Sequence, residues 1–532
     1  MYSRISSAAI HGLEILLISV EADISDGLPA FIMVGYLSAQ VREAEDRIRS
    51  SFRNNSLPFP AKRITVNLSP ASVPKSGSLY DLPIALALLS SNAQIPPDAL
   101  HEVLAVGELS LSGEINPVNG VLPIAVKAVQ SGIRTMLVPS ANAGECGNIP
   151  NLRIIGLHTL KEAVSFLRYG ELPSASPAAE QPTDTTVNDA VDFRDIQGQA
   201  LAQRAAEIAV AGFHNLLLAG PPGSGKTMIA RRIPSILPSL TESEALEIAQ
   251  IYSIAGLLDP LHPEIKNRPY RHPHHTISPQ ALAGGGRIPS PGEITLAHRG
   301  VLFLDEMPEF SKKALEILRQ PLEDREIIIS RSAGTFRFPA NFLLLAAMNR
   351  CPCGLYPDLS RCTCSPQEIS SYMNRISKPL LDRIDLTVQC KAVTYEELTA
   401  GKKGSQSSAE IRCRVEAVRE IESRRFRDVP WHFNSEIPAS AVRDFCRMDS
   451  RAEHTLAVFY ELYSLSARSY HRAVKVARTI ADLASSELIR SEHIEEALVF
   501  RAFDQPSPGQ RVKPLIKSSF SGQERQINHG FR

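Results

Sequence analysis

Eight consecutive residues, Gly220 to Thr227, carry the clearest chemistry in this sequence. They read GPPGSGKT and directly follow a short apolar run, residues 215–219. The pattern G-x-x-x-x-G-K-[ST] between a buried strand and a helix is typical of a phosphate-binding loop, in which the lysine reaches the β- and γ-phosphates and the hydroxyl ligates Mg²⁺. We therefore predict that ATP and Mg²⁺ bind here, through Gly220, Gly223, Ser224, Gly225, Lys226 and Thr227.

Two acidic residues, Asp305 and Glu306, end a second buried run, residues 301–304. If this run is a strand of a parallel sheet, its carboxylates lie at the carboxyl edge, beside the phosphate-binding loop. We predict that Asp305 holds the Mg²⁺ through water and that Glu306 polarises the attacking water. Such a pair alone is often only a strand end followed by a helix cap, so the prediction depends on the loop at 220–227.

Four cysteines, Cys351, Cys353, Cys362 and Cys364, fall within 14 residues in the pattern C-x-C-x8-C-x-C. Four thiolates so close in a chain without a disulfide framework can close a tetrahedral zinc site. The C-x-C spacing is tighter than the usual C-x₂-C, and four free thiols in a loop are the alternative. We expect a structural Zn²⁺ held by all four sulfur atoms.

The elements that position these residues divide the chain. At 532 residues it is too long for one hydrophobic core, so we expect two or three domains in an α/β multidomain fold. The stretch SASPAAEQPTDTTVNDAVD lacks apolar periodicity and is typical of a linker, whereas helical spacing dominates near the C-terminus. We predict an N-terminal domain at 1–170, a linker at 171–192, an ATPase core at 193–400, a helical domain at 401–504 and a basic, disordered tail at 505–532.

The composition limits the classes of function. With 57 basic and 57 acidic residues the formal net charge is zero, so any binding to nucleic acid needs a local basic patch. No basic segment followed by an apolar run begins the chain, and no window reaches the roughly 18 apolar residues of a membrane span. Eight cysteines, four of them bunched together, do not form a disulfide framework. We expect a cytoplasmic protein with no membrane partner.

One long block resembles a known family. Residues 268–310, RPYRHPHHTISPQALAGGGRIPSPGEITLAHRGVLFLDEMPEF, followed by CPCG and LLDRIDL, are similar to the magnesium-chelatase-like AAA+ family, and the resemblance covers nearly the whole chain. It implies a P-loop parallel-sheet core with a pre-sensor hairpin, followed by a C-terminal α-helical lid. It also implies a homohexameric ATP-dependent DNA helicase that drives branch migration during natural transformation. Its partners would be single-stranded and branched DNA, together with recombination proteins.

The resemblance adds three polar residues to the nucleotide site. Asn349 ends a buried run, where AAA+ proteins hold a polar residue that aligns the water against the γ-phosphate. Arg383 lies in the segment that resembles the arginine finger, which reaches the nucleotide of the neighbouring subunit. Arg468, or Arg472 as the second choice, matches the phosphate-sensing arginine of the lid. A metal held by the cysteines would brace the loop between Asn349 and Arg383.

Two arginines are candidates for contact with DNA. Arg287 lies in the Gly/Pro-rich segment 284–292, which in the helix-2-insert group of this superfamily projects into the ring pore. Arg331 begins the turn of a predicted β-hairpin, residues 327–338, whose small basic tip suits a phosphate backbone. Packing of either segment against the neighbouring subunit is the alternative.

The N-terminal block resembles the Lon protease domain, a ribosomal-S5-like α/β fold. Residues 73–81 and 113–122 are similar to its two active-site segments, in which a serine nucleophile and a lysine base carry peptide hydrolysis. The serine position falls on Leu79 and the lysine position on Leu122. Leucine can neither attack a carbonyl nor accept a proton. We expect a domain without peptidase activity that serves ring assembly or DNA contact.

Two other functions compete with the DNA motor. A chelatase-type motor would drive insertion of Mg²⁺ into a porphyrin through partner subunits, but it is not expected to carry a Lon-like N-terminal domain. A protease-linked unfoldase is disfavoured by Leu79 and Leu122. Stimulation of ATP hydrolysis by DNA would separate the first function from the other two.

Overall fold

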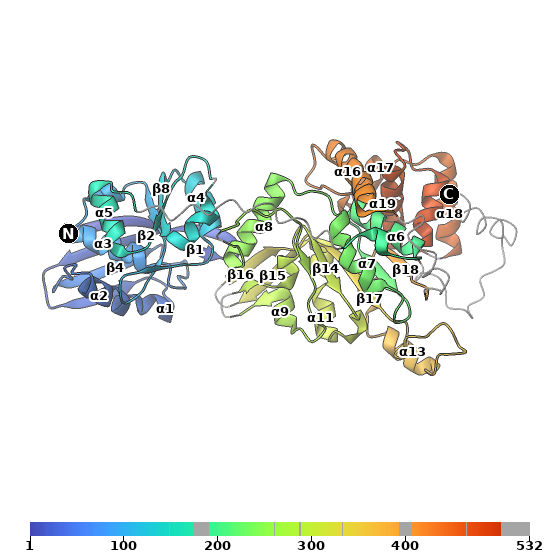
Figure 1. The fold of residues 1–532 in the computed structure, drawn as a ribbon, viewed down its shortest axis with the longest axis horizontal. Coiled ribbons are helices and arrows are strands. Elements are labelled where there is room, and N and C mark those ends of the chain that lie inside the picture. Colours follow the sequence, from blue (N-terminus) through green and yellow to red (C-terminus); the bar gives the residue numbers. More distant parts are fainter. Residues whose placement is uncertain are drawn as a thin grey trace.

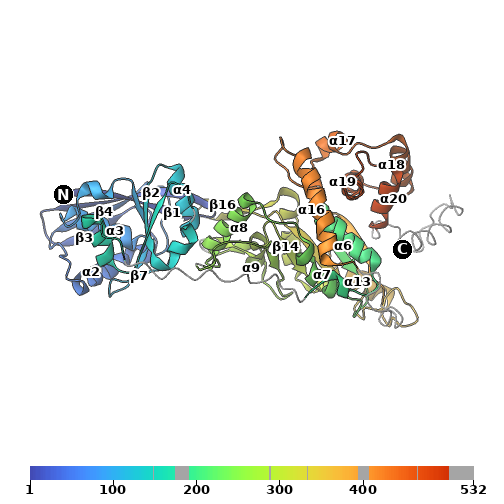
Figure 2. The same cartoon turned by 45° about the horizontal axis from the view of Figure 1, so that its top comes forward.

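The computed structural model describes residues 1–147, 149–173, 191–259, 261–286, 289–331, 334–392, 406–463 and 465–501 of the 532-residue chain. Most of the predicted linker, the polar loop at 401–405 and the predicted tail at 505–532 lie outside these ranges. Figures 1 and 2 show an N-terminal α/β domain at one end of the molecule, a central sheet with its helices, and a helical domain at the other end. Among the described residues, no helix is long and apolar enough to cross a membrane.

The N-terminal domain is built on a seven-stranded mixed sheet in the order β3-β4-β2-β1-β5-β8-β9. Its strands are β1 (Tyr2–His11), β2 (Glu14–Ser25), β3 (Ala30–Val34), β4 (Arg63–Ser69), β5 (Val103–Ala105), β8 (Thr135–Pro139) and β9 (Arg153–Leu157), and β6 (Glu108–Leu109) pairs separately with β7 (Ile115–Asn116). Its helices are α1 (Ala39–Arg42), α2 (Ala44–Asn54), α3 (Asp81–Ser91), α4 (Val121–Gln130) and α5 (Leu160–Tyr169). Every residue of α3 is buried, because this helix packs against β1 and β2 in the centre of the domain core.

The central sheet has five parallel strands in the order β11-β14-β17-β10-β18. They are β10 (Leu216–Ala219), β11 (Tyr270–Arg271), β14 (Val301–Leu304), β17 (Leu343–Met348) and β18 (Leu386–Gln389). Every residue of β10, β14 and β17 is buried, as expected for a parallel sheet covered on both faces. Alternate residues of β10 enter two different cores: Leu216 and Leu218 face one, and Leu217 and Ala219 face the other.

Short helices and two hairpins surround this sheet. The helices are α6 (Ala200–Gly212), α7 (Lys226–Arg232), α8 (Glu242–Ala255), α9 (Pro279–Ala283), α10 (Glu293–Leu296), α11 (Lys312–Ile317), α12 (Pro321–Asp324), α13 (Pro366–Met373) and α14 (Lys378–Leu381). The hairpins are β12 (Gly284–Gly285) with β13 (Ser290–Pro291), and β15 (Glu326–Arg331) with β16 (Gly334–Pro339). The second is the predicted pre-sensor hairpin, and its apolar residues join the core on one face of the sheet.

The C-terminal domain is helical, as the sequence predicts. Its helices are α16 (Ser408–Arg425), α17 (Val442–Phe445), α18 (Ser450–Leu462), α19 (Ala467–Leu483) and α20 (Ser491–Val499). The first of them begins with a capping box, in which the side chains of Ser407 and Glu410 satisfy backbone N–H groups. Both α16 and α19 pack against α6, so the helical domain shares one apolar core with a face of the central sheet.

Candidate functional site

The phosphate-binding loop runs from the carboxyl end of β10 to the first turn of α7, the context that the sequence predicts. Gly225 caps α7 with a φ of +85°, in the left-handed region that a side chain disfavours. A Cβ at Gly220 would lie 2.4 Å from the carbonyl oxygen of Cys390, so the backbones there approach too closely for any other residue. Gly223 and Ser224 lie between these two glycines, and the hydroxyl of Ser224 is buried with no hydrogen-bond partner among the described residues.

Lys226 is only 9% exposed and points back into the loop. Its ammonium donates to the carbonyl oxygens of Gly220 and Pro221, at 2.8 Å each, and to Oδ1 of Asn349 at 3.2 Å. Burial lowers the pKa of Lys226, and the nearby Cys390, Asp305 and Glu306 only partly oppose this shift. A lysine held only by neutral oxygens is free to exchange them for an anionic phosphate.

Thr227 and Asp305 meet at the carboxyl edge of the sheet. The Thr227 hydroxyl donates to Oδ2 of Asp305 at 2.9 Å, and the backbone N–H of Glu306 donates to Oδ1 of Asp305 at 3.0 Å. The Glu306 side chain is exposed. The Asp305 strand is not the direct neighbour of β10, because β17 lies between them and brings Asn349 to the same edge.

The three candidate sensing arginines lie elsewhere. Arg383 precedes β18, and its carbonyl oxygen accepts from Asn215 at the amino end of β10. Both Arg383 and Arg468 form ion pairs with Glu323 of α12, whereas Arg472 lies 3.6 Å from Asp385. Partial burial raises the pKa of Glu323, but the hydrogen bonds and charges of the two arginines outweigh it and lower this pKa. These arginines therefore gather at the amino edge of the sheet, opposite Lys226.

The two DNA-contact candidates differ in what the structure says of them. Arg287 lies outside the described residues. Arg331 is exposed at the tip of the β15–β16 hairpin. On the other strand of this hairpin, Phe336 stacks on His11 with ring centroids 4.2 Å apart. The hairpin thus packs against the N-terminal domain of its own chain, while Arg331 at its tip stays exposed.

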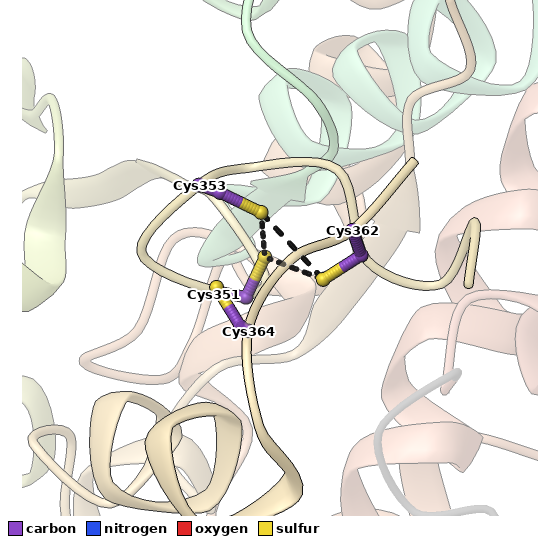
Figure 3. Close-up of side chains that lie close together, drawn as sticks. All are labelled: Cys351, Cys353, Cys362 and Cys364. Carbon is purple, nitrogen blue, oxygen red and sulfur yellow. Dashed lines mark hydrogen bonds between the residues drawn. The ribbon is translucent and has the colours of Figure 1, made fainter. Parts of the chain in front are cut away.

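The four cysteines converge in the segment between β17 and α13 (Figure 3). The sulfur of Cys351 lies 3.4 Å from that of Cys353 and 3.8 Å from that of Cys362, and the latter two are 3.5 Å apart. All four sulfur atoms lie within 4.8 Å of one another. Zinc–sulfur bonds of about 2.3 Å place the corners of a tetrahedron about 3.8 Å apart. The spacing therefore suits a tetrahedral metal ion, with Cys351 fully buried beneath it.

The two leucines at the Lon catalytic positions have different surroundings. Both are buried, but Leu79 lies in the N-terminal core, whereas Leu122, 5% exposed, packs against Ala249 within α8 and Leu258 just after it. The same helix hydrogen-bonds to the start of α4, since the carbonyl of Ser253 accepts from Gly120 at 3.0 Å. The position that matches the Lon lysine has therefore become part of an interdomain contact.

A buried carboxylate completes this contact. Glu145 accepts hydrogen bonds from the Ser253 hydroxyl at 2.7 Å and from Asn142 at 2.6 Å. Burial raises the pKa of Glu145, and these hydrogen bonds, with one from the Leu122 backbone, partly oppose the shift. Sequence reasoning missed both Glu145 and Ser253, because no motif links residues 108 positions apart.

Comparison with known proteins is consistent with these observations. Family models described as "Magnesium chelatase, subunit ChlI", "Subunit ChlI of Mg-chelatase" and "Magnesium chelatase, subunit ChlI C-terminal" match residues 192–398, 20–142 and 405–501. A part of the N-terminal domain is also 26% identical, over 138 residues, to Lon protease 2 of Thermus thermophilus, covering 25% of this chain and 17% of that protein.

Two relatives match along almost their whole length. The protein YifB of Escherichia coli is 41% identical over 507 residues, which cover 94% of this chain and 97% of YifB. The competence protein ComM of Haemophilus influenzae is 42% identical over 504 residues, with the same coverage of the two chains. The chain therefore belongs to the magnesium-chelatase-like AAA+ ATPase family that includes the competence protein ComM.

Proposed function

We propose that this protein is an ATP-hydrolysing, homohexameric motor that drives branch migration of DNA during natural transformation. The observation that carries the proposal is the division of the nucleotide machinery between two edges of one sheet. Lys226, Thr227 and Asp305 meet at the carboxyl edge, while Arg383 and Arg468 lie at the amino edge. One chain alone therefore does not bring both the phosphate-binding residues and the two arginines to a single nucleotide.

At the carboxyl edge the residues fit ATP and Mg²⁺. The unpartnered hydroxyl of Ser224 and the ammonium of Lys226 supply donors for phosphate oxygens. A hydroxyl and a carboxylate 2.9 Å apart, from Thr227 and Asp305, are the oxygen ligands that Mg²⁺ takes in such sites. When bound, the cation neutralises charge on the phosphates. Glu306, which follows Asp305 and is exposed, would orient and deprotonate the attacking water, and Asn349 would align it.

The amino edge supports assembly into a ring. Four residues of β10 at roughly 3.3 Å each separate the two edges by about 13 Å, too far for Arg383 to reach the phosphates of its own chain. A head-to-tail contact between identical subunits closes into a ring and brings this edge against the neighbour's loop. Arg383 and Arg468 would then exchange Glu323 for the γ-phosphate of the neighbouring subunit, so both arginines act in trans.

The proposal that the substrate is DNA rests on the family and on two segments of this chain. The relative from Haemophilus influenzae is named as a competence protein. Arg331 at the exposed hairpin tip, and Arg287 in the segment after α9, would supply the local positive charge that the neutral chain needs. Single-stranded and branched DNA, with recombination proteins, are the proposed partners.

We also propose that the cysteine cluster binds one structural Zn²⁺ per chain. The sulfur spacing and the burial of Cys351 support this. All eight cysteines are free, in keeping with a reducing compartment, and we propose a cytoplasmic location.

A chelatase-type motor acting on a porphyrin is the second candidate, because all three family models carry the name of a magnesium chelatase subunit. One of them matches residues 20–142, so an N-terminal domain of this kind does not separate the two functions, contrary to the expectation from the sequence. The likeness to ComM over 94% of the chain favours the DNA motor.

The deciding experiment measures ATP turnover by gel-filtered protein with and without branched DNA. We expect DNA to increase the rate several-fold and to bind to the hexameric fraction. Turnover that ignores DNA but responds to a porphyrin and partner subunits would favour the chelatase function. Absence of turnover in every condition would refute the ATPase itself.

A further inference from the structure

The segment that holds the cysteines touches the phosphate-binding loop directly. Gly354, one residue after Cys353, has a φ of +79° and is buried. A Cβ on Gly354 would lie 2.4 Å from Cδ and 2.7 Å from Cγ of Pro222, the third residue of the phosphate-binding loop. The backbone of the cysteine segment therefore lies against Pro222 with no room for a side chain between them.

A second contact joins the same two segments. Asn349, two residues before Cys351, accepts the hydrogen bond from the Lys226 ammonium at 3.2 Å. Cys351 then organises the turn that leads to Gly354: its carbonyl accepts from the Gly354 N–H at 3.0 Å, and its sulfur accepts from the Tyr356 N–H at 3.3 Å. Cys351, a proposed metal ligand, therefore lies in the chain between Asn349 and Gly354, the two residues that contact the phosphate-binding loop.

We propose that the metal held by the four cysteines positions the phosphate-binding loop, so that affinity for nucleotide depends on metal occupancy. This inference rests on the proposed ATP and zinc sites. A metal held by the four sulfur atoms, which lie together in Figure 3, would join Cys351 to Cys362 and Cys364 and so close the turn that carries Gly354. Without it the turn relaxes, Pro222 loses its support, and nucleotide binding must again order that backbone. Ordering one residue corresponds to about a 5- to 30-fold change in an equilibrium constant.

The test uses the full-length protein, purified without chelator. Elemental analysis gives zinc per chain, and the anisotropy of a fluorescent ATP analogue, in excess Mg²⁺, gives the dissociation constant. A chelator selective for zinc over Mg²⁺ should weaken binding about 5- to 30-fold, and added Zn²⁺ should restore it. An unchanged dissociation constant after the zinc is lost would overturn the inference while leaving the zinc site and the ATP site standing.

A pair of glycine variants separates positioning from general damage. Gly354→Ala keeps all four cysteines but pushes on Pro222, so we expect normal zinc content with weakened nucleotide binding. Gly132→Ala is the matched control, because Gly132 has a similar φ of +80° and an added Cβ there meets nothing within 4 Å. Equal binding by both variants would refute the contact. Purified protein that binds nucleotide but contains no zinc would refute both the metal site and this inference. Zinc-loaded protein that binds no nucleotide would instead refute the ATP site on which this inference rests.

Discussion

Truncating Leu122 to alanine should loosen the contact between the N-terminal domain and α8. The side chain is 5% exposed and packs against Ala249 and Leu258. Leu→Ala changes at buried positions cost about 2–5 kcal/mol, and a small interdomain cluster can partly close, which places this one at about 2–3 kcal/mol. Since 1.4 kcal/mol is about a factor of ten, the equilibrium between docked and undocked domains should shift by about 30- to 150-fold.

Hydrogen–deuterium exchange measures this shift at the contact. The backbone N–H of Gly120 donates to the carbonyl of Ser253 at 3.0 Å, so it is protected only while the domains are docked. The N–H of Leu122 donates to the Ser253 hydroxyl at 3.4 Å and also to Glu145 of its own domain. In the Leu122→Ala variant, exchange in peptides around residues 118–125 should become faster, by up to the 30- to 150-fold shift in the docking equilibrium. Leu89→Ala, in the core of the N-terminal domain, is the control that lowers domain stability without touching α8. Unchanged exchange at 118–125 in Leu122→Ala would refute the reasoning.

Three further variants test the nucleotide site. Lys226→Ala should abolish binding of a fluorescent ATP analogue, because it removes the cation held at the mouth of the loop; retained binding would contradict the assignment. Glu306→Gln should keep ATP bound and slow its hydrolysis by about 100- to 10,000-fold in single-turnover assays, and a normal rate would show that another group activates the water. Arg383→Ala should lose about 1,000-fold or more of turnover, yet regain part of it when mixed with Lys226→Ala, because each variant supplies what the other's interface lacks. No recovery in rings shown by mass spectrometry to be mixed would mean that Arg383 does not act in trans.

The sequence was most informative where the chemistry lies in consecutive residues. The loop at 220–227 is a single local motif, and the strand-end argument placed Asp305 at the same edge as Thr227, where the structure brings the two together. The order of the strands in the central sheet could not be predicted from the sequence. Nothing in the run at 343–348 distinguishes a strand between β10 and β14 from one outside them, because all three runs are uniformly apolar.

Contacts between distant polar residues were also out of reach. Glu323 is one acidic residue of a short helix and looks like any solvated carboxylate, yet it pairs with both Arg383 and Arg468 from segments 60 and 145 residues away. The stacking of Phe336 on His11 is similar: two short runs on either side of a turn predicted the hairpin, but not which domain covers it. Tertiary packing decides such contacts, and the local spacing of residues in the sequence does not indicate them.

Restoring the Lon-type pair should not restore peptidase activity. In a Leu79→Ser, Leu122→Lys double variant, the new lysine would begin in the apolar cluster that α8 closes, and Glu145 lies beside the Leu122 backbone. The serine would lie in a separate core, with Leu79 now only 7% exposed. Casein and fluorogenic-peptide assays with ATP should therefore remain blank for the wild type and the double variant. Cleavage that appears in the double variant and disappears when Ser at position 79 is returned to leucine would show that a peptide still reaches both positions, and that α8 does not block them.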